Sequence, residues 1–152
     1  ATKDEVAHYV DLMPDGTHRQ YTSIQEAKSV ITAPSGGQKL LKHGYYDITG
    51  LAWSGRGTVE KVEVSVDGGR NWRGARLEGP ILPKALTRFH CDWVWQGEEA
   101  LLQARVTDST GYIQPSRAQL VEIRGTRSIY HNNAIQTWRV GVDGEVHNVQ
   151  LG

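Results

Sequence analysis

Residues 50–72 read GLAWSGRGTVEKVEVSVDGGRNW, and this stretch decides the fold. Within it, Val62, Val64 and Val66 alternate with polar residues. Successive side chains of a β-strand point to opposite faces, so the alternation places the three valines together on one face. The stretch therefore predicts a half-buried strand, with the valines turned toward a core.

Glycine-rich triplets flank this predicted strand at residues 55–57 and 67–69. Glycine adopts the positive-φ conformations of tight turns without a Cβ clash, so we interpret both triplets as hairpin turns. Trp72 opens the outgoing strand and is expected to fold back over the valine face. The run from Ser65 to Trp72 also resembles an Asp-box hairpin, in which Asp67 caps its own turn and has a structural role.

The rest of the chain is made of further short β-rich segments. Residues 87–96 carry large side chains at every second position, namely Phe89, Cys91, Trp93 and Trp95, which predicts the inner face of a core strand. We expect further strands at residues 23–33, 44–53, 72–77, 100–106, 135–142 and 145–151, with a short one at 119–123. The segment at 23–33 is also compatible with a short helix.

Candidate core residues on the other strands are Tyr46, Ile48, Trp53, Leu102, Ala104 and Val106. Gly, Asp and Pro punctuate the strands, as in residues 34–37, 78–85, 108–111 and 142–144. Neither a long amphipathic helix nor an internal repeat is evident. The pattern of about seven to nine short strands predicts an all-β fold, an immunoglobulin-like antiparallel β-sandwich. Residues 1–22 are expected to form a peripheral extension.

Composition excludes several classes of function. The chain has 152 residues, with 17 Lys and Arg against 17 Asp and Glu, so its formal net charge is zero. A nucleic-acid binder needs a basic excess to neutralise phosphates, and none is present. Membrane-surface attraction has no support either, and no apolar run approaches the roughly 20 residues of a transmembrane helix. The chain opens without an initiator Met or a signal core, which suggests a processed or truncated chain, or a small secreted protein whose signal was removed.

Few residues suggest chemistry. Cys91 is the single cysteine and lies in the apolar stripe, so we expect a buried structural thiol. Six histidines are scattered without metal-ligand spacing, so no metal site is expected. Nucleophile elbows, phosphate-binding loops and dinucleotide fingerprints are absent, so this chain alone is expected to be catalytically inactive. The densest basic site is Arg124 to Arg127, which suits an oxyanion, although a solvated loop is the alternative.

Several motifs occur together in one order: Gly50-Leu51-Ala52-Trp53-Ser54-Gly55, residues 64–72, Trp93-Val94-Trp95, residues 104–109 with Gln114-Pro115, and Arg124-Gly125. In this order and spacing they resemble the C-terminal dimerisation domain of the sulfite oxidase family of molybdenum enzymes, over roughly residues 29–149. Within that family, residues 26–32 and 128–134 are most similar to the sulfane dehydrogenase (sulfite dehydrogenase-like) subunit of the bacterial thiosulfate-oxidising Sox system.

The resemblance implies an organisation in which residues 1–28 are the tail of a molybdopterin domain and residues 29–152 form the immunoglobulin-like dimerisation domain. It implies a periplasmic homodimer whose full-length enzyme holds a molybdenum cofactor and oxidises inorganic or protein-bound sulfur. A c-type cytochrome subunit would accept the electrons, and a sulfur-carrier protein would be the substrate. The family's molybdenum-ligating cysteine lies in the molybdopterin domain and Cys91 does not match it, so no cofactor is expected in this chain alone.

The resemblance also implies a substrate-binding role for Arg124. In the family, the arginine of the Arg-Gly step after the Gln-Pro motif reaches back to the substrate oxyanion pocket, and Arg124 occupies that position, with Arg127 as its helper. Residues 121–123 are Val-Glu-Ile here, where sulfite oxidases commonly have Trp-Asn-Leu. A second hypothesis of a different class is a secreted β-sandwich binding module with no redox chemistry.

Overall fold

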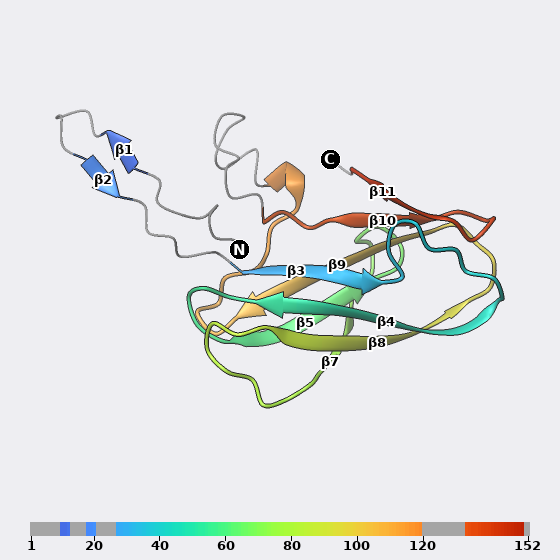
Figure 1. Cartoon of the computed structure of the whole chain (residues 1–152), viewed down its shortest axis with the longest axis horizontal. Helices are drawn as coiled ribbons and strands as arrows, with labels where there is room; N and C mark the ends of the chain where they lie inside the picture. Colours follow the sequence, from blue (N-terminus) through green and yellow to red (C-terminus); the bar gives the residue numbers. More distant parts are fainter. Residues whose placement is uncertain (1–9, 13–17, 21–26, 120–132, 151–152) are drawn as a thin grey trace.

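The computed structural model describes residues 10–12, 18–20, 27–119 and 133–150. Nearly all regular structure in these ranges is β, arranged in two antiparallel sheets that face each other (Figure 1). The predicted immunoglobulin-like β-sandwich is therefore confirmed. Ahead of it, β1 (Val10–Leu12) and β2 (His18–Gln20) pair as a small antiparallel hairpin.

The first sheet has the strand order β3-β4-β8-β7. Its strands are β3 (Lys28–Ala33), β4 (Gly44–Trp53), β8 (Thr87–Trp95) and β7 (Arg76–Leu77). The second sheet has the order β11-β10-β9-β5-β6. Its strands are β11 (Val146–Val149), β10 (Thr137–Val140), β9 (Ala100–Asp108), β5 (Val59–Ser65) and β6 (Arg73–Gly74). Of the segment predicted at 23–33, residues 28–33 are a strand, and Ala27 precedes it.

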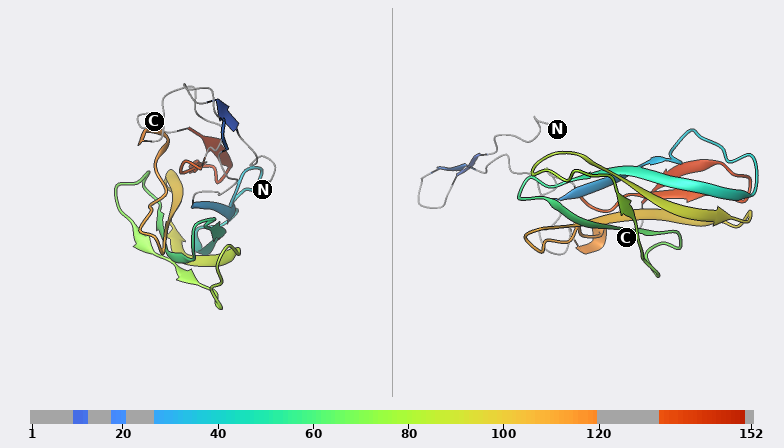
Figure 2. Two further views of the ribbon diagram at one scale, coloured as in Figure 1. Left: turned by 90° about the vertical axis from the view of Figure 1, so that its left-hand side faces the viewer. Right: turned by 90° about the horizontal axis from the view of Figure 1, so that it is seen from below.

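The core lies between the two sheets, as the side and bottom views show (Figure 2). The predicted stripe of β8 is buried throughout, with Phe89 at 0% and Trp95 at 2% exposure. From the second sheet, Leu102 and Val106 of β9 and Val62 of β5 meet this stripe, each at most 1% exposed. Period-two alternation therefore predicted the inner faces of these strands correctly, because a strand's side-chain parity is a local property.

The predicted hairpin turn at residues 55–57 is wrong. β4 and β5 belong to different sheets, so the residues between them form a crossover rather than a hairpin. Gly57 does not adopt a positive φ there. The glycine leaves room for the Ser109 side chain instead, because a Cβ at this position would overlap Ser109 Oγ.

The second predicted turn, at residues 67–69, is confirmed. Gly68 and Gly69 have φ values of 76° and 96°, and the turn joins β5 to β6 as a hairpin. The outgoing strand predicted at 72–77 is split at Ala75, whose N–H donates to Val62 O (2.8 Å). β6 stays in the second sheet and β7 joins the first.

Trp72 does not fold over the valine face. The Arg105 guanidinium carbon lies 4.1 Å from the centre of its ring. Arg105 alternates with the buried Ala104 and Val106, so it points to the outer face of the second sheet. The turn therefore delivers Trp72 to the outer surface, where a cation–π contact takes the place of core packing.

Two further expectations are corrected. Trp53 is only half-buried, whereas its neighbour Ala52, which shares the parity of Ile48, is 0% exposed. Gln119, the first residue of the strand predicted at 119–123, lies in a helical turn, and residues 120–123 fall outside the described residues. In the described part of the chain no helix is long and apolar enough to cross a bilayer.

Candidate functional site

The predicted substrate-binding residues Arg124 and Arg127 lie outside the described residues, so their role stays a prediction. What the structure does describe is the base of the segment that carries them. Residues 114–119 lead into that segment and residues 133–135 lead out of it. The contacts between these two ends define where the segment leaves the sandwich and returns to it.

The side-chain amide of Gln114 is the centre of these contacts and is 1% exposed. Its Oε1 accepts hydrogen bonds from Ser29 Oγ (2.7 Å) and from the Val106 N–H (3.3 Å). Its Nε2 donates to the Asn133 carbonyl (2.8 Å). One amide therefore links β3, β9 and the returning end of the segment, using both its acceptor and its donor.

Asn133 completes this arrangement, which we call the Gln114 clamp (Ser29, Gln114 and Asn133). Its Nδ2 donates to the Ala27 carbonyl (2.9 Å) and to the Tyr112 hydroxyl (3.0 Å). The backbone supports it, since the Ile135 N–H donates to Pro115 O (2.9 Å). Ala27 immediately precedes β3, so Asn133, at the returning end of the segment, is fixed beside the point where the chain enters the sandwich.

A second polar corner holds the crossover against the end of β9. Ser54 Oγ donates to Asp108 Oδ2 (2.8 Å), and Asp108 Oδ1 accepts from the Thr110 and Tyr112 N–H groups (3.0 and 3.1 Å). Burial of Asp108 opposes ionisation, but hydrogen bonds from Thr110 and Ser54 outweigh it, so the pKa of Asp108 is lowered. The corner orients Tyr112, whose hydroxyl reaches the clamp.

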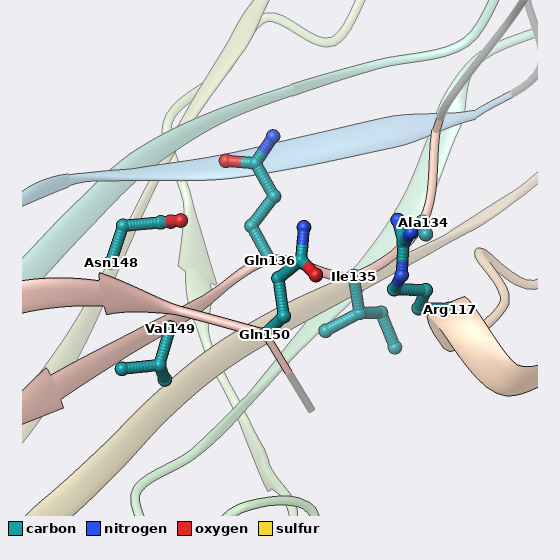
Figure 3. A pocket seen from close by; sticks show the side chains of 7 residues that line it. All are labelled: Arg117, Ala134, Ile135, Gln136, Asn148, Val149 and Gln150. Carbon is teal, nitrogen blue, oxygen red and sulfur yellow. The ribbon is translucent and has the colours of Figure 1, made fainter. Parts of the chain in front are cut away.

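A shallow hollow of about 150 Å³ lies beside the clamp (Figure 3). It is lined by Arg117, Ala134, Ile135, Gln136, Asn148, Val149 and Gln150. In Figure 3 the Gln136 and Gln150 side chains extend the same way from the chain, and the Arg117 guanidinium points toward Ala134. The hollow is smaller than the 300–1,000 Å³ typical of ligand pockets. It accommodates a side chain or a few waters at the base of the segment.

The described residues do not fit a molybdenum site. Cys91 is 6% exposed and faces the core, and burial raises the pKa of its thiol. A metal ligand must be a thiolate with access to the metal, which this environment disfavours. Cys91 is therefore the buried structural thiol predicted from its place in the stripe.

His90 lies between two carboxylates on the outer face of the first sheet. Its Nε2 lies 2.5 Å from Glu78 Oε2, and its Nδ1 lies 2.9 Å from Asp47 Oδ2. The two carboxylates bind opposite ring nitrogens, so the three groups do not converge on one point. Across the described ranges, no three His, Cys, Asp or Glu side chains form a metal-binding group. Hydrogen bonds to Glu78 and then to Asp47 raise the pKa of His90.

The clamp residues were only partly visible in the sequence. Gln114 belonged to the Gln-Pro motif, but nothing indicated that its amide is the central contact. Ser29 and Asn133 lie 85 and 19 positions from Gln114 along the chain, so no local pattern connects the three. Only the paired sheets bring them together.

Comparison with known proteins places this geometry in context. A family model described as the Mo-co oxidoreductase dimerisation domain matches residues 19–138. The crystal structure of the sulfane dehydrogenase SoxCD from Paracoccus pantotrophus is similar with a TM-score of 0.86 and 54% sequence identity. That match covers 95% of this chain and 37% of that chain.

Two curated relatives are sulfite oxidases. The Gallus gallus protein is 35% identical over 120 residues, which is 73% of this chain and 26% of that protein. The mitochondrial Mus musculus protein is 50% identical over 119 residues, which is 70% of this chain and 21% of that protein. The chain thus spans about a quarter of the length of these relatives.

Truncating the clamp should destabilise the sandwich. Gln114→Ala leaves the buried Ser29 hydroxyl and Asn133 carbonyl without their partner, so the free energy of unfolding should fall by about 3 kcal/mol. Urea-induced unfolding measures the change. The exposed Gln96→Ala is the matched control and should stay within about 0.5 kcal/mol of the unaltered chain. An equal, small effect of both changes would contradict a structural role for the Gln114 amide.

The His90 cluster should titrate above the ordinary histidine value of about 6.5. When the pKa of a histidine is higher in the folded state than in the unfolded state, its protonation stabilises the fold. This contribution is complete below the unfolded-state pKa and is lost as the pH rises through the folded-state pKa. The free energy of unfolding of the unaltered chain, relative to that of the His90→Gln variant, should therefore fall between pH 6 and pH 9. NMR titration of the ring measures the pKa directly. Glu78→Gln should lower the pKa of His90 more than Asp47→Asn does. A His90 pKa at or below the ordinary histidine value in the unaltered chain would contradict the role of the two carboxylates.

Proposed function

The chain belongs to the family of Mo-co oxidoreductase dimerisation domains, and on this premise we propose that it is the dimerisation domain of a molybdenum-dependent sulfane or sulfite dehydrogenase. The family resemblance drawn from the sequence motifs is thereby confirmed. The proposal rests on one observation above all, the 54% identity with a sulfane dehydrogenase over 95% of this chain. No comparison favours a separate β-sandwich binding module.

The full-length enzyme would oxidise inorganic or protein-bound sulfur in the bacterial periplasm. It would pass the electrons to a c-type cytochrome subunit and take its sulfur from a carrier protein. The molybdenum cofactor would be held by a preceding domain, because the one cysteine of this chain is buried in the core. We place the boundary with that domain near residue 28, where β3 begins.

Within this enzyme, the segment between the two ends of the Gln114 clamp would supply substrate contacts. Arg124, helped by Arg127, would stabilise the anionic sulfur substrate through charge-assisted hydrogen bonds. The clamp supports this role, because it fixes Asn133, the returning end of the segment, beside Ala27. A preceding molybdopterin domain would connect at that same end of the sandwich.

The test of this function uses the full-length protein from its natural source. Its intact mass should lie well above the 16.9 kDa of this chain, with about one molybdenum per polypeptide. It should reduce a c-type cytochrome when given a carrier protein loaded with sulfane sulfur, or sulfite. A native protein of 16.9 kDa without molybdenum would overturn the proposal and revive the binding-module hypothesis.

In that enzyme, Arg124→Ala should lower kcat/KM at least tenfold, because it removes a fixed cation from the anionic substrate. Arg127→Ala should have a smaller effect of the same sign. Steady-state kinetics with the sulfur substrate measure both, and Arg70→Ala, an exposed arginine in the β5–β6 turn, serves as the control. An unchanged kcat/KM in Arg124→Ala would exclude this residue from the substrate site.

A further inference from the structure

The ring of His90 joins three elements on the outer face of the first sheet. His90 itself belongs to β8, Asp47 belongs to β4, and Glu78 directly follows β7. Both ring nitrogens lie within hydrogen-bond distance of a carboxylate, at 2.9 Å for Asp47 and 2.5 Å for Glu78. The His90 side chain is 19% exposed, so its ring has little contact with water. We call Asp47, Glu78 and His90 the His90 cluster.

This geometry requires two N–H groups on the ring. A carboxylate only accepts hydrogen bonds, whereas a neutral imidazole has one N–H and one lone pair. With a neutral ring, one carboxylate would face the lone pair at hydrogen-bond distance, and the two negative charges would act on each other without a cation between them. The imidazolium donates to both carboxylates, and these same hydrogen bonds raise the pKa of His90.

The surrounding charges leave no other cation to replace the proton. On the outer face of β8, Arg88 and Asp92 lie two positions before and after His90. Asp92 accepts a hydrogen bond from the Tyr45 hydroxyl of β4 (2.9 Å) and lies 4.0 Å from Arg76 of β7. When His90 is neutral, the three carboxylates of this surface exceed its two arginines. Loss of the proton therefore favours the departure of one carboxylate.

The two carboxylates of the cluster are held to different degrees. Asp47 lies within β4, which is hydrogen-bonded to β3 on one side and β8 on the other. Its Oδ1 is buried and has no hydrogen-bond partner among the described residues. The Glu78 side chain is 55% exposed and lies beyond the end of the two-residue edge strand β7. A more buried carboxylate loses more when its donor is removed, so Asp47 retains the remaining N–H and Glu78 turns to water.

Glu78 is also the first residue of the connection from β7 to β8, which forms the yellow-green loop below β8 in Figure 1. Residues 79–84 of this connection are exposed, and they include the apolar Ile81 and Leu82, at 38% and 54%. Its backbone is tied at two points, since the Glu78 N–H donates to Arg88 O (2.9 Å) and the Lys84 N–H donates to Gly57 O (3.2 Å). The His90 cluster adds a side-chain tie at its start.

We propose that the His90 cluster is a pH-sensitive switch, which fastens the β7–β8 connection to the first sheet while His90 is protonated and releases Glu78 when His90 loses its proton. The Nε2 proton passes to solvent, Nδ1–H continues to donate to Asp47, and water takes over the Glu78 carboxylate. Release changes how Ile81 and Leu82 are presented at the edge of the sheet. The inference goes beyond the proposed function and does not rest on it, because every group involved lies in the described sandwich.

Hydrogen exchange of the full-length protein, read by mass spectrometry on the millisecond scale, tests the switch. The reporters are the Glu78 and Lys84 amides. Their protection factors, which correct for the intrinsic pH dependence of exchange, should fall by at least about tenfold as the pH rises through the folded-state pKa of His90. The midpoint should coincide with the pKa that NMR gives for the ring.

The Leu40 amide is the internal reference, because it donates to Gly144 O (2.8 Å) between elements that do not contact the cluster through any described hydrogen bond. Its protection should stay constant over the same pH range. An equal loss of protection at Leu40 would show general loosening of the sandwich and would overturn a switch confined to the connection.

Two variants test the charge conflict itself. In Asp47→Asn, the new carboxamide donates to the Nδ1 lone pair of a neutral ring, so Nε2–H stays on Glu78 and the protection should be high at every pH. In His90→Gln no cation holds the two carboxylates together, so the protection should be low at every pH. The two substitutions thus fix the switch in opposite states.

The outcomes decide the inference without reference to the proposed function. Protection of Glu78 and Lys84 that is independent of pH in the wild type would overturn it. An Asp47→Asn protein that loses protection with pH as the wild type does would also overturn it, since the charge conflict would then not be the cause. This second comparison holds even where His90→Gln fails to fold. Molybdenum content and cytochrome reduction decide the proposed function separately.

Discussion

The Gln114 amide is the contact on which the arrangement of this domain depends. The two sheets are held together mainly by apolar burial, which is strong but has no directional preference. Hydrogen bonds supply the direction, and Gln114 makes them at once to β3, to β9 and to Asn133. Each hydrogen bond contributes only about 1 kcal/mol net to stability, but a buried donor or acceptor left without a partner costs about 1–3 kcal/mol. The penalty for an alternative geometry is therefore larger than the gain from the native one.

The same logic applies to the turns that carry the family motifs. Asp108 holds the end of β9 against Ser54, and Asp67 holds the β5–β6 turn through the Arg70 and Asn71 N–H groups (3.1 and 2.9 Å). Hydrogen bonds from Asn71 and Ser65 lower the pKa of Asp67, so it remains a carboxylate acceptor. Two of the motifs that first suggested an enzyme family, residues 64–72 and 104–109, thus contain polar corners of a scaffold. Their residue types are restricted by hydrogen-bond geometry rather than by a reaction.

Features that depend on local interactions could be predicted from the sequence, whereas features that depend on contacts between distant segments could not. Strand parity is local, so the alternation around Phe89 and Val62 identified the inner faces correctly. The sheet to which a strand belongs depends on pairing between distant segments, and for this reason the glycines at 55–57 suggested a hairpin where the chain crosses between sheets. Trp72 was misplaced for a related reason, because its partner Arg105 lies on β9. The clamp joins residues that only the completed fold brings together.

In the full-length enzyme, the contribution that we propose for this domain is geometric. Its two proposed tasks are to pair with a second copy and to present the substrate-binding segment, whose base is held by Ser29 of the first sheet. Ser29 of the clamp is the register partner of Ala52 in β4, and Ala52 is in turn the partner of Thr87 in β8. Continuous hydrogen-bonded strands thus connect the clamp to β8. Because close-packed interiors transmit displacement with little compression, the outer face of β8 and the base of the segment are held in a fixed relation.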